Sequence, residues 1–139
     1  MSLTMIDTIR ITKLDHVVVR AQDLDKLVSF YCDVLGCSFE HSSKVVEGLV
    51  HLRAGTSFID IMQAEDGYEP LTGGRGNMDH LCIQVEPFSQ EEMTDYLNRH
   101  GAGPGEFGRR FGADGDGISV YIRDPEGNEV ELKAGPEPV

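Results

Sequence analysis

Two histidines and two carboxylates occupy equivalent places in two parts of the sequence. His16 and His80 each lie at the start of a hydrophobic run, and Asp60 and Glu131 each lie within a later one. Two imidazoles and two carboxylates form a mixed nitrogen and oxygen donor set, which suits a divalent first-row metal. We therefore predict one ion per site (Zn, Ni, Mn, Fe or Co) bound by these four residues. Because the set has no thiolate, a site open to water or substrate is favoured over a closed structural zinc site.

The equivalence of these residues comes from an internal duplication. Leu14–Val19 aligns with Met78–Ile83 at an offset of 64 residues, and Asp60 aligns with Glu131 at an offset of 71. Two copies with so long a period do not make a solenoid. The sequence therefore predicts two similar modules, related by a pseudo-two-fold axis, that bring the four side chains towards one cavity.

The elements that must position these residues repeat in the same order. Hydrophobic and β-branched runs predict strands at 14–20, 38–41, 45–53 and 56–63, and again at 77–86, 118–123 and 129–133, with an irregular stretch at 103–111. One helix follows the N-cap Asp23 and ends at Gly36, and the other follows Ser89 and ends at Gly101. The expected fold class is α+β: two tandem βαβββ modules forming a cupped mixed sheet, with helices on the outer face.

The domain boundaries follow from these elements. We expect a single domain over residues 13–134, preceded by an N-terminal extension (1–12) and followed by a C-terminal tail (135–139). Module one covers 13–64 and module two covers 77–134. Between them, residues 65–76 form a polar, glycine-rich loop that is expected to close over the cavity and exclude water.

The composition narrows the classes of partner. The 139 residues include 24 acidic and 12 basic side chains, a net charge of −12, which disfavours binding to nucleic acid. No apolar run is long enough to cross a membrane, and the N-terminus has no secretion signal. Three cysteines without a CxxC pair do not suggest a disulfide framework. We expect a cytoplasmic protein with a small-molecule substrate.

Four motifs resemble the glyoxalase superfamily, also called the vicinal oxygen chelate superfamily, over residues 13–134. The motifs are Leu-Asp-His16, Phe30–Gly36, Met-Asp-His80 and Tyr121–Glu131, the last with Asp-Pro-Glu-Gly inside it. The resemblance implies two βαβββ modules cupped around a metal, usually in a homodimer. It also implies that the metal ligands fall on His16, Asp60, His80 and Glu131.

The ligand pattern is most similar to that of glyoxalase I. Arg20 stands four residues after His16, where glyoxalase I has an arginine that binds a glutathione carboxylate. Four residues after Asp60, however, Ala64 replaces the asparagine that is usual in that enzyme. Extradiol dioxygenases carry a catalytic histidine shortly before the residue matched by Tyr121, and residues 113–117 contain none. The resemblance implies a metal-dependent lyase or isomerase acting on a small oxygen-chelating substrate, possibly a 2-oxoaldehyde thiol adduct, through an enediolate. An extradiol-type dioxygenase and a non-catalytic binding (resistance) protein are the alternatives.

The sequence also suggests roles for individual polar residues in catalysis, substrate binding and structure. Glu131 is the first choice for the catalytic base and Asp60 the second. Arg20, Arg109 and Arg110 are predicted to bind an anionic end of the substrate, although a solvated loop is the simpler reading of the last two. Asp15 and Asp79 are expected on the outer face in structural roles. His41, His51 and His100 have no partner in the repeat and are expected to be surface residues.

Overall fold

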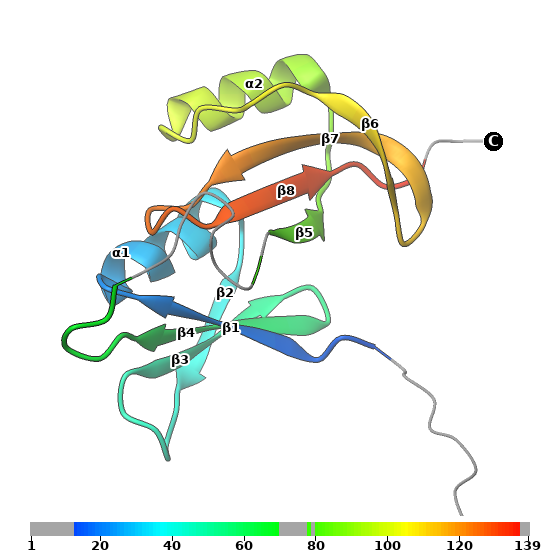
Figure 1. The fold of residues 1–139 in the computed structure, drawn as a ribbon. Helices are drawn as coiled ribbons and strands as arrows, with labels where there is room; N and C mark the ends of the chain where they lie inside the picture. The colour runs from blue at the N-terminus through cyan, green and yellow to red at the C-terminus, as the bar shows by residue number, and fades with distance from the viewer. Residues whose placement is uncertain (1–12, 70–77, 79, 137–139) are drawn as a thin grey trace, which may run out of the picture.

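A computed structural model describes residues 13–69, 78 and 80–136 of the chain and shows two βαβββ modules (Figure 1). The first module consists of β1 (His16–Ala21), α1 (Leu24–Ser29), the π-helical turn η1 (Phe30–Val34), β2 (Ser38–Ser42), β3 (Leu49–Ala54) and β4 (Ser57–Gln63). The second consists of β5 (Leu81–Gln84), α2 (Gln90–Arg99), β6 (Gly108–Gly112), β7 (Gly115–Arg123) and β8 (Glu129–Lys133). The predicted duplication and the α+β class are confirmed.

Each module has its own four-stranded mixed sheet. The strand orders are β1-β4-β3-β2 and β5-β8-β7-β6, so the two sheets have the same topology. In each sheet the first strand pairs in parallel with the last, and the other pairs are antiparallel. β4, which carries Asp60, and β8, which carries Glu131, therefore each lie between two other strands. Each carboxylate thus has side chains of an adjacent strand on both sides.

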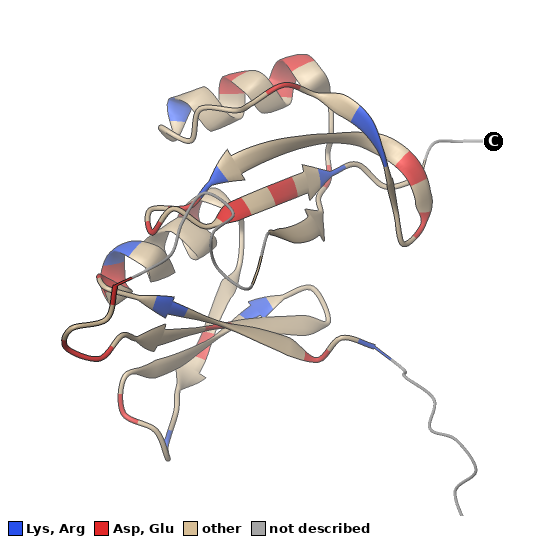
Figure 2. Cartoon of the chain, in the orientation of Figure 1, with Lys and Arg blue, Asp and Glu red and all other residues tan. Residues whose placement is uncertain are grey.

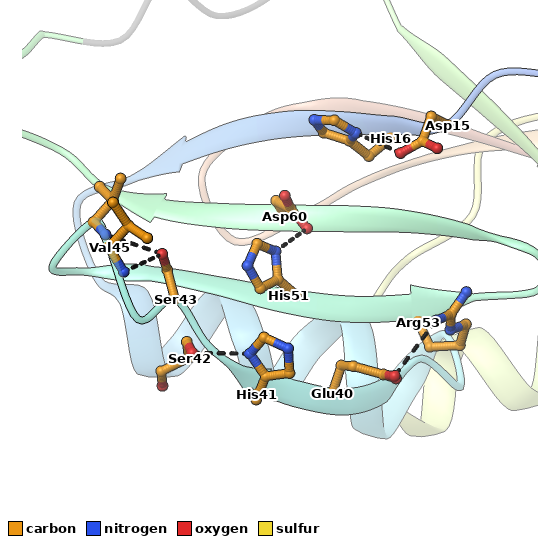
Figure 3. A network of polar contacts seen from close by, with 11 residues as sticks. Asp15, His16, Glu40, His41, Ser42, Ser43, Val45, His51, Arg53 and Asp60 are labelled. Carbon is orange, nitrogen blue, oxygen red and sulfur yellow. Dashed lines mark hydrogen bonds and ion pairs between the residues drawn. The ribbon is translucent and has the colours of Figure 1, made fainter.

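Alternation along β4 and β8 separates an apolar face from a polar one. Ile59 and Ile61 are buried in the core, as are Val130 and Leu132. The first helix lies behind its sheet, on the face opposite the polar side chains (Figure 3), and α2 covers one face of the second sheet (Figure 1). Burial of each such aliphatic side chain is worth about 1.5–3 kcal/mol. The helices therefore leave the faces that carry Asp60 and Glu131 open.

Polar contacts tie the two modules together. The Tyr31 hydroxyl, at the first helix, donates to Asp124 Oδ2 at 2.9 Å, in the turn between β7 and β8. In the same turn, Glu126 accepts hydrogen bonds from the backbone amides of Gln22 and Asp23 at 2.9 and 3.1 Å. The Asp-Pro-Glu-Gly motif, which reads as a simple turn in the sequence, thus fixes the start of the first helix against module two.

The structure departs from the expected elements mainly at strand ends. Within the strand expected at 77–86, β5 covers Leu81–Gln84, whereas β6 (Gly108–Gly112) is a regular strand that begins in the stretch expected to be irregular. Part of the loop expected at 65–76 and residue Asp79 lie outside the described residues. Among the described residues, no helix is long and apolar enough to cross a membrane. Figure 2 shows acidic positions on α2, on β8 and in turns of both modules.

Candidate functional site

The first predicted pair, His16 and Asp60, lies on the open face of sheet one but does not form a direct contact (Figure 3). His16 Nδ1 lies 2.8 Å from Asp15 Oδ1, and the His16 side chain is 48% exposed. This hydrogen bond raises the pKa of His16 and lowers that of Asp15. Asp15, which was expected in a structural role on the outer face, contacts His16 and orients its imidazole.

Asp60 is paired with His51, a residue that the sequence placed on the surface. The two residues are register partners on β4 and β3, and His51 Nδ1 lies 3.0 Å from Asp60 Oδ1. Their side chains are only 21% and 6% exposed. The surface assignment of His51 was therefore wrong. Alternation along a strand predicts which face of the sheet a histidine occupies. It does not predict which residue of the adjacent strand lies beside it, because that depends on the register between the strands, which the internal repeat does not reveal.

The short approach of His51 to Asp60 is not a well-aligned hydrogen bond. Both Nδ1 of His51 and Oδ1 of Asp60 are buried, and neither has a hydrogen-bond partner among the described residues, although the two atoms lie 3.0 Å apart. Buried polar atoms without partners are unusual and costly. A nitrogen and an oxygen atom that lie side by side without hydrogen bonds are suitable ligands for a cation bound at this face.

The second predicted pair, His80 and Glu131, is in contact. His80 Nε2 lies 3.3 Å from Glu131 Oε1. The other carboxylate oxygen, Oε2, accepts a hydrogen bond from the Ser119 hydroxyl at 2.7 Å. Ser119 is fully buried on β7, and Glu131 is also buried, on β8. One oxygen is therefore fixed by the protein while the other faces the imidazole.

Two further side chains border the Glu131 carboxylate. Tyr121 is its register partner on β7, and its ring meets the His80 ring edge to face at 5.2 Å between centroids. Cys82 is its register partner on β5. Burial together with the Glu131 charge raises the pKa of Tyr121, and the same two causes raise that of Cys82 to about 11. Both groups are therefore neutral near pH 7 and available as hydrogen-bond donors to the carboxylate.

The three predicted substrate-binding arginines have different surroundings. Arg20 is exposed on β1, with its guanidinium 6.0 Å from the centre of the Tyr68 ring. Arg109 is exposed, and its Nε lies 3.7 Å from Asp116 Oδ2. Arg110 is half-buried, and its Nη1 donates to both the carbonyl and the hydroxyl oxygen of Ser119 at 2.7 and 2.9 Å. Arg20 and Arg109 thus face solvent, whereas Arg110 supports the Ser119–Glu131 contact.

One chain does not gather the four predicted ligands. Within residues 13–69, 78 and 80–136, no three His, Cys, Asp or Glu side chains lie close enough to hold one ion. A pocket of about 1030 Å³ lies between η1 and α2, with Leu35, Met93 and Tyr96 in its lining, but none of the four ligands borders it. The predicted ligands therefore lie in two separate groups, which we call half-sites: His16 and Asp60 with His51, and His80 and Glu131 with Ser119.

Sequence reasoning missed two residues of these half-sites. His51 was visible as a histidine on a strand adjacent to the Asp60 strand, and register alone pairs it with Asp60. Ser119 carried no signal in the repeat, and its hydrogen bond to Glu131 runs diagonally across β7 and β8, since the register partner of Glu131 is Tyr121. Neither contact has a counterpart in the other module, so the repeat gave no sign of it.

Comparison with known proteins agrees with this architecture. The chain is 32% identical over 130 residues to the glyoxalase domain-containing protein RDO1 of Mycosarcoma maydis, covering 89% of this chain and 69% of that protein. It is 31% identical over 127 residues to virulence protein STM3117 of Salmonella typhimurium, covering 88% and 83%. Both matches extend across the two modules.

The solved structures give the same result. An integron cassette protein from the mobile metagenome of V. cholerae superposes with a TM-score of 0.73 at 26% identity, covering 91% of this chain and 98% of that one. The family model described as Glyoxalase/Bleomycin resistance protein/Dioxygenase superfamily matches residues 13–132, from just before β1, which begins at His16, into β8, which carries Glu131. With its paired βαβββ modules and a histidine and a carboxylate on the open face of each, the chain belongs to the Glyoxalase/Bleomycin resistance protein/Dioxygenase superfamily.

Proposed function

We propose that the protein is a metal-dependent lyase or isomerase of the glyoxalase type, acting on a small substrate that presents two neighbouring oxygens. The metal would be held by His16 and Asp60 from module one and by His80 and Glu131 from module two. The observation that carries this proposal is the His80–Glu131 contact at 3.3 Å, where a buried carboxylate keeps one oxygen towards the imidazole. A solvated surface pair would not be buried and fixed in this way.

The donor set fits a divalent first-row ion. It offers imidazole nitrogens and carboxylate oxygens without a thiolate in the predicted quartet, which suits Zn, Ni, Mn, Fe or Co. The unpartnered Oδ1 of Asp60 and the Ser119 bond to Oε2 of Glu131 are consistent with carboxylates prepared for a ligand. Asp15, which holds His16 Nδ1, leaves the other ring nitrogen for coordination.

The chain's own residues then account for the chemistry. A bound divalent ion acts as a Lewis acid, which stabilises the negative charge that develops on the substrate oxygens. Glu131 removes the proton from the adjacent carbon, a contribution of roughly 10²–10⁴-fold for a positioned base. Asp60 is the second choice for this role. Arg20 and Arg109, whose guanidinium groups are exposed, orient an anionic end of the substrate.

A homodimer completes the site in this proposal. The open face of sheet one exposes Val18, the register partner of Asp60, an apolar side chain that an isolated module would leave in water. Because the two half-sites lie apart within one chain, the proposed dimer places module one of one copy against module two of the other copy. Closed two-fold symmetry then produces two equivalent sites per dimer. The three free cysteines suit the reducing cytoplasm.

The test measures bound metal and activity in the same preparations. Wild-type protein is expected to bind one divalent ion per chain and to consume a methylglyoxal–thiol adduct only when loaded. His80→Ala is expected to lose the ion, whereas His100→Gln, at the end of α2, is expected to keep it. Full metal occupancy in His80→Ala contradicts the proposed site.

The same measurements separate the alternatives. Oxygen consumption with Fe(II) and a catechol, in place of adduct turnover, would identify an extradiol-type dioxygenase. A wild-type protein that stays free of metal in metal-replete buffer would identify a non-catalytic binder.

A further inference from the structure

We propose that His51 is a metal ligand, which joins Asp60 in the half-site of module one. This inference rests on the proposed function, because it concerns the same ion. It adds a third imidazole to the two predicted from the repeat. Nothing in the internal duplication pointed to it, since the residue has no equivalent histidine in module two.

The contact geometry favours a cation between the two side chains. His51 Nδ1 and Asp60 Oδ1 lie 3.0 Å apart, both buried, and neither has an aligned hydrogen bond within the described residues. If Nδ1 carries no proton, two lone pairs face each other at this distance and repel. A divalent ion that binds both atoms removes the repulsion and satisfies both buried groups.

The His51 ring is held in place by its neighbours. It stacks on the Phe58 ring with 5.6 Å between centroids and an interplanar angle of 28°. On the same sheet, the Arg53 guanidinium lies 4.3 Å from the centre of the Phe58 ring. Figure 3 shows His51 pointing towards Asp60 from the adjacent strand, on the face opposite the helix. A ligand whose rotamer is fixed by packing loses little entropy on binding an ion.

The second module provides an internal comparison. The register partner of Glu131 on β7 is Tyr121, whereas the register partner of Asp60 on β3 is His51. A neutral phenol donates to its carboxylate, but an imidazole can share a metal with it. Asp60 is also one methylene shorter than Glu131, so a neighbouring nitrogen donor compensates for its shorter reach. An imidazole-rich set favours Zn, Ni or Fe over Mn.

The test compares His51→Gln with His41→Gln in full-length, metal-free protein titrated with Zn²⁺ by calorimetry. His41 is the matched control because it is a histidine of the neighbouring strand that contacts the His51 ring but not Asp60. We expect His51→Gln to weaken Zn²⁺ binding by at least about tenfold and His41→Gln to leave it within about twofold. Unfolding curves of both metal-free variants confirm that the proteins are folded.

A second measurement needs no variant. In ¹⁵N-histidine wild-type protein, addition of Zn²⁺ is expected to shift the Nδ1 resonance of His51. If the wild type binds Zn²⁺ and His51→Gln binds it equally well, with an unchanged His51 resonance, His51 is only an ion-pair partner and the inference fails while the proposed function stands. If the wild type binds no divalent ion, both fail.

Discussion

The Glu131 carboxylate is held by side chains from both adjacent strands, and the contacts differ between its two oxygens. Ser119 donates to Oε2, and Arg110 in turn donates to Ser119 Oγ, so a chain of three polar groups runs from the half-buried guanidinium to the carboxylate. Such outer contacts orient a metal ligand and set its basicity. We therefore propose that Arg110 positions Glu131 through Ser119, in place of the substrate contact predicted from the sequence.

Removing the Ser119 hydroxyl tests this chain of contacts. Ser119→Ala leaves Glu131 Oε2 buried without its 2.7 Å hydrogen bond, so we expect metal affinity to fall roughly tenfold and the free energy of unfolding to fall by about 1–3 kcal/mol. Calorimetric titration and urea unfolding provide the two measurements. Arg110→Ala should weaken metal binding in the same direction, whereas Arg109→Ala, one position along, should not. Equal effects of the two arginine variants would contradict the positioning role.

Cys82 reports on the charge of Glu131. Burial and the neighbouring carboxylate raise the pKa of this thiol to about 11. Replacing Glu131 by Gln removes the negative charge, which lowers the pKa and increases the thiolate fraction at any pH below it. In metal-free protein, iodoacetamide should therefore label the Cys82 peptide faster at pH 8 in Glu131→Gln than in the wild type.

Mass spectrometry of the Cys82 peptide gives this rate separately from Cys32 and Cys37. Glu129→Gln is the matched control, because it removes a carboxylate from the same strand that is not among the causes of the Cys82 shift. An unchanged rate in Glu131→Gln would show that burial alone sets the pKa of this thiol.

At the scale of elements, each helix ends in a left-handed glycine that turns the chain back to its sheet. Gly36 and Gly101 have φ of 81° and 71°, at matching places in the two modules. Side chains with a Cβ adopt this region at a cost of about 1–2 kcal/mol. The placement of β2 after the first helix therefore depends on a glycine at position 36.

Gly36→Ala is expected to lower the free energy of unfolding by about 1–2 kcal/mol. Nothing lies within 4 Å of the added Cβ, so the loss comes from backbone conformation and not from a clash. Gly103→Ala is the control, since this glycine also has free space but no positive φ. Urea unfolding of both variants measures the difference, and a Gly36→Ala protein as stable as Gly103→Ala would refute the argument.

At the scale of the whole molecule, the two half-sites raise the question of how many chains make one site. The Tyr31–Asp124 hydrogen bond and the Glu126 contacts hold the modules in a defined arrangement within the chain. In that arrangement no three metal-type ligands meet among the described residues. We therefore propose a site shared between two copies of the chain. This arrangement makes a prediction that a site within one chain does not.

Mixing two inactive proteins tests this shared site. One variant carries His16→Ala and Asp60→Asn, and the other carries His80→Ala and Glu131→Gln. After unfolding and refolding together, a mixed dimer would pair an intact module one with an intact module two, so random pairing restores about a quarter of the wild-type sites. Metal content and activity of the mixture measure this recovery. No recovery, in a mixture shown to contain mixed dimers, would place each site within one chain.

Much of this arrangement was predictable from the sequence because it depends on local patterns. The duplication, the two helices with their caps at Asp23 and Ser89, and the strand Glu129–Lys133 all follow from periodicity and from capping or turn residues. The open-face positions of Asp60 and Glu131 follow from alternation along single strands. The bounds of the strand near His80 did not follow, because they depend on its pairing with β8, which runs over Leu81–Gln84.

The sequence by itself determined which residue types lie on the open face of each sheet, since side-chain direction alternates along a strand whatever its neighbours are. Only the tertiary structure decided which of these residues meet. Register between strands placed His51 against Asp60, and a diagonal contact between β7 and β8 brought the Ser119 hydroxyl to Glu131. Among the described residues, no three potential metal ligands meet within one chain. Contacts across strands and modules depend on distances between remote parts of the chain, which no local pattern encodes.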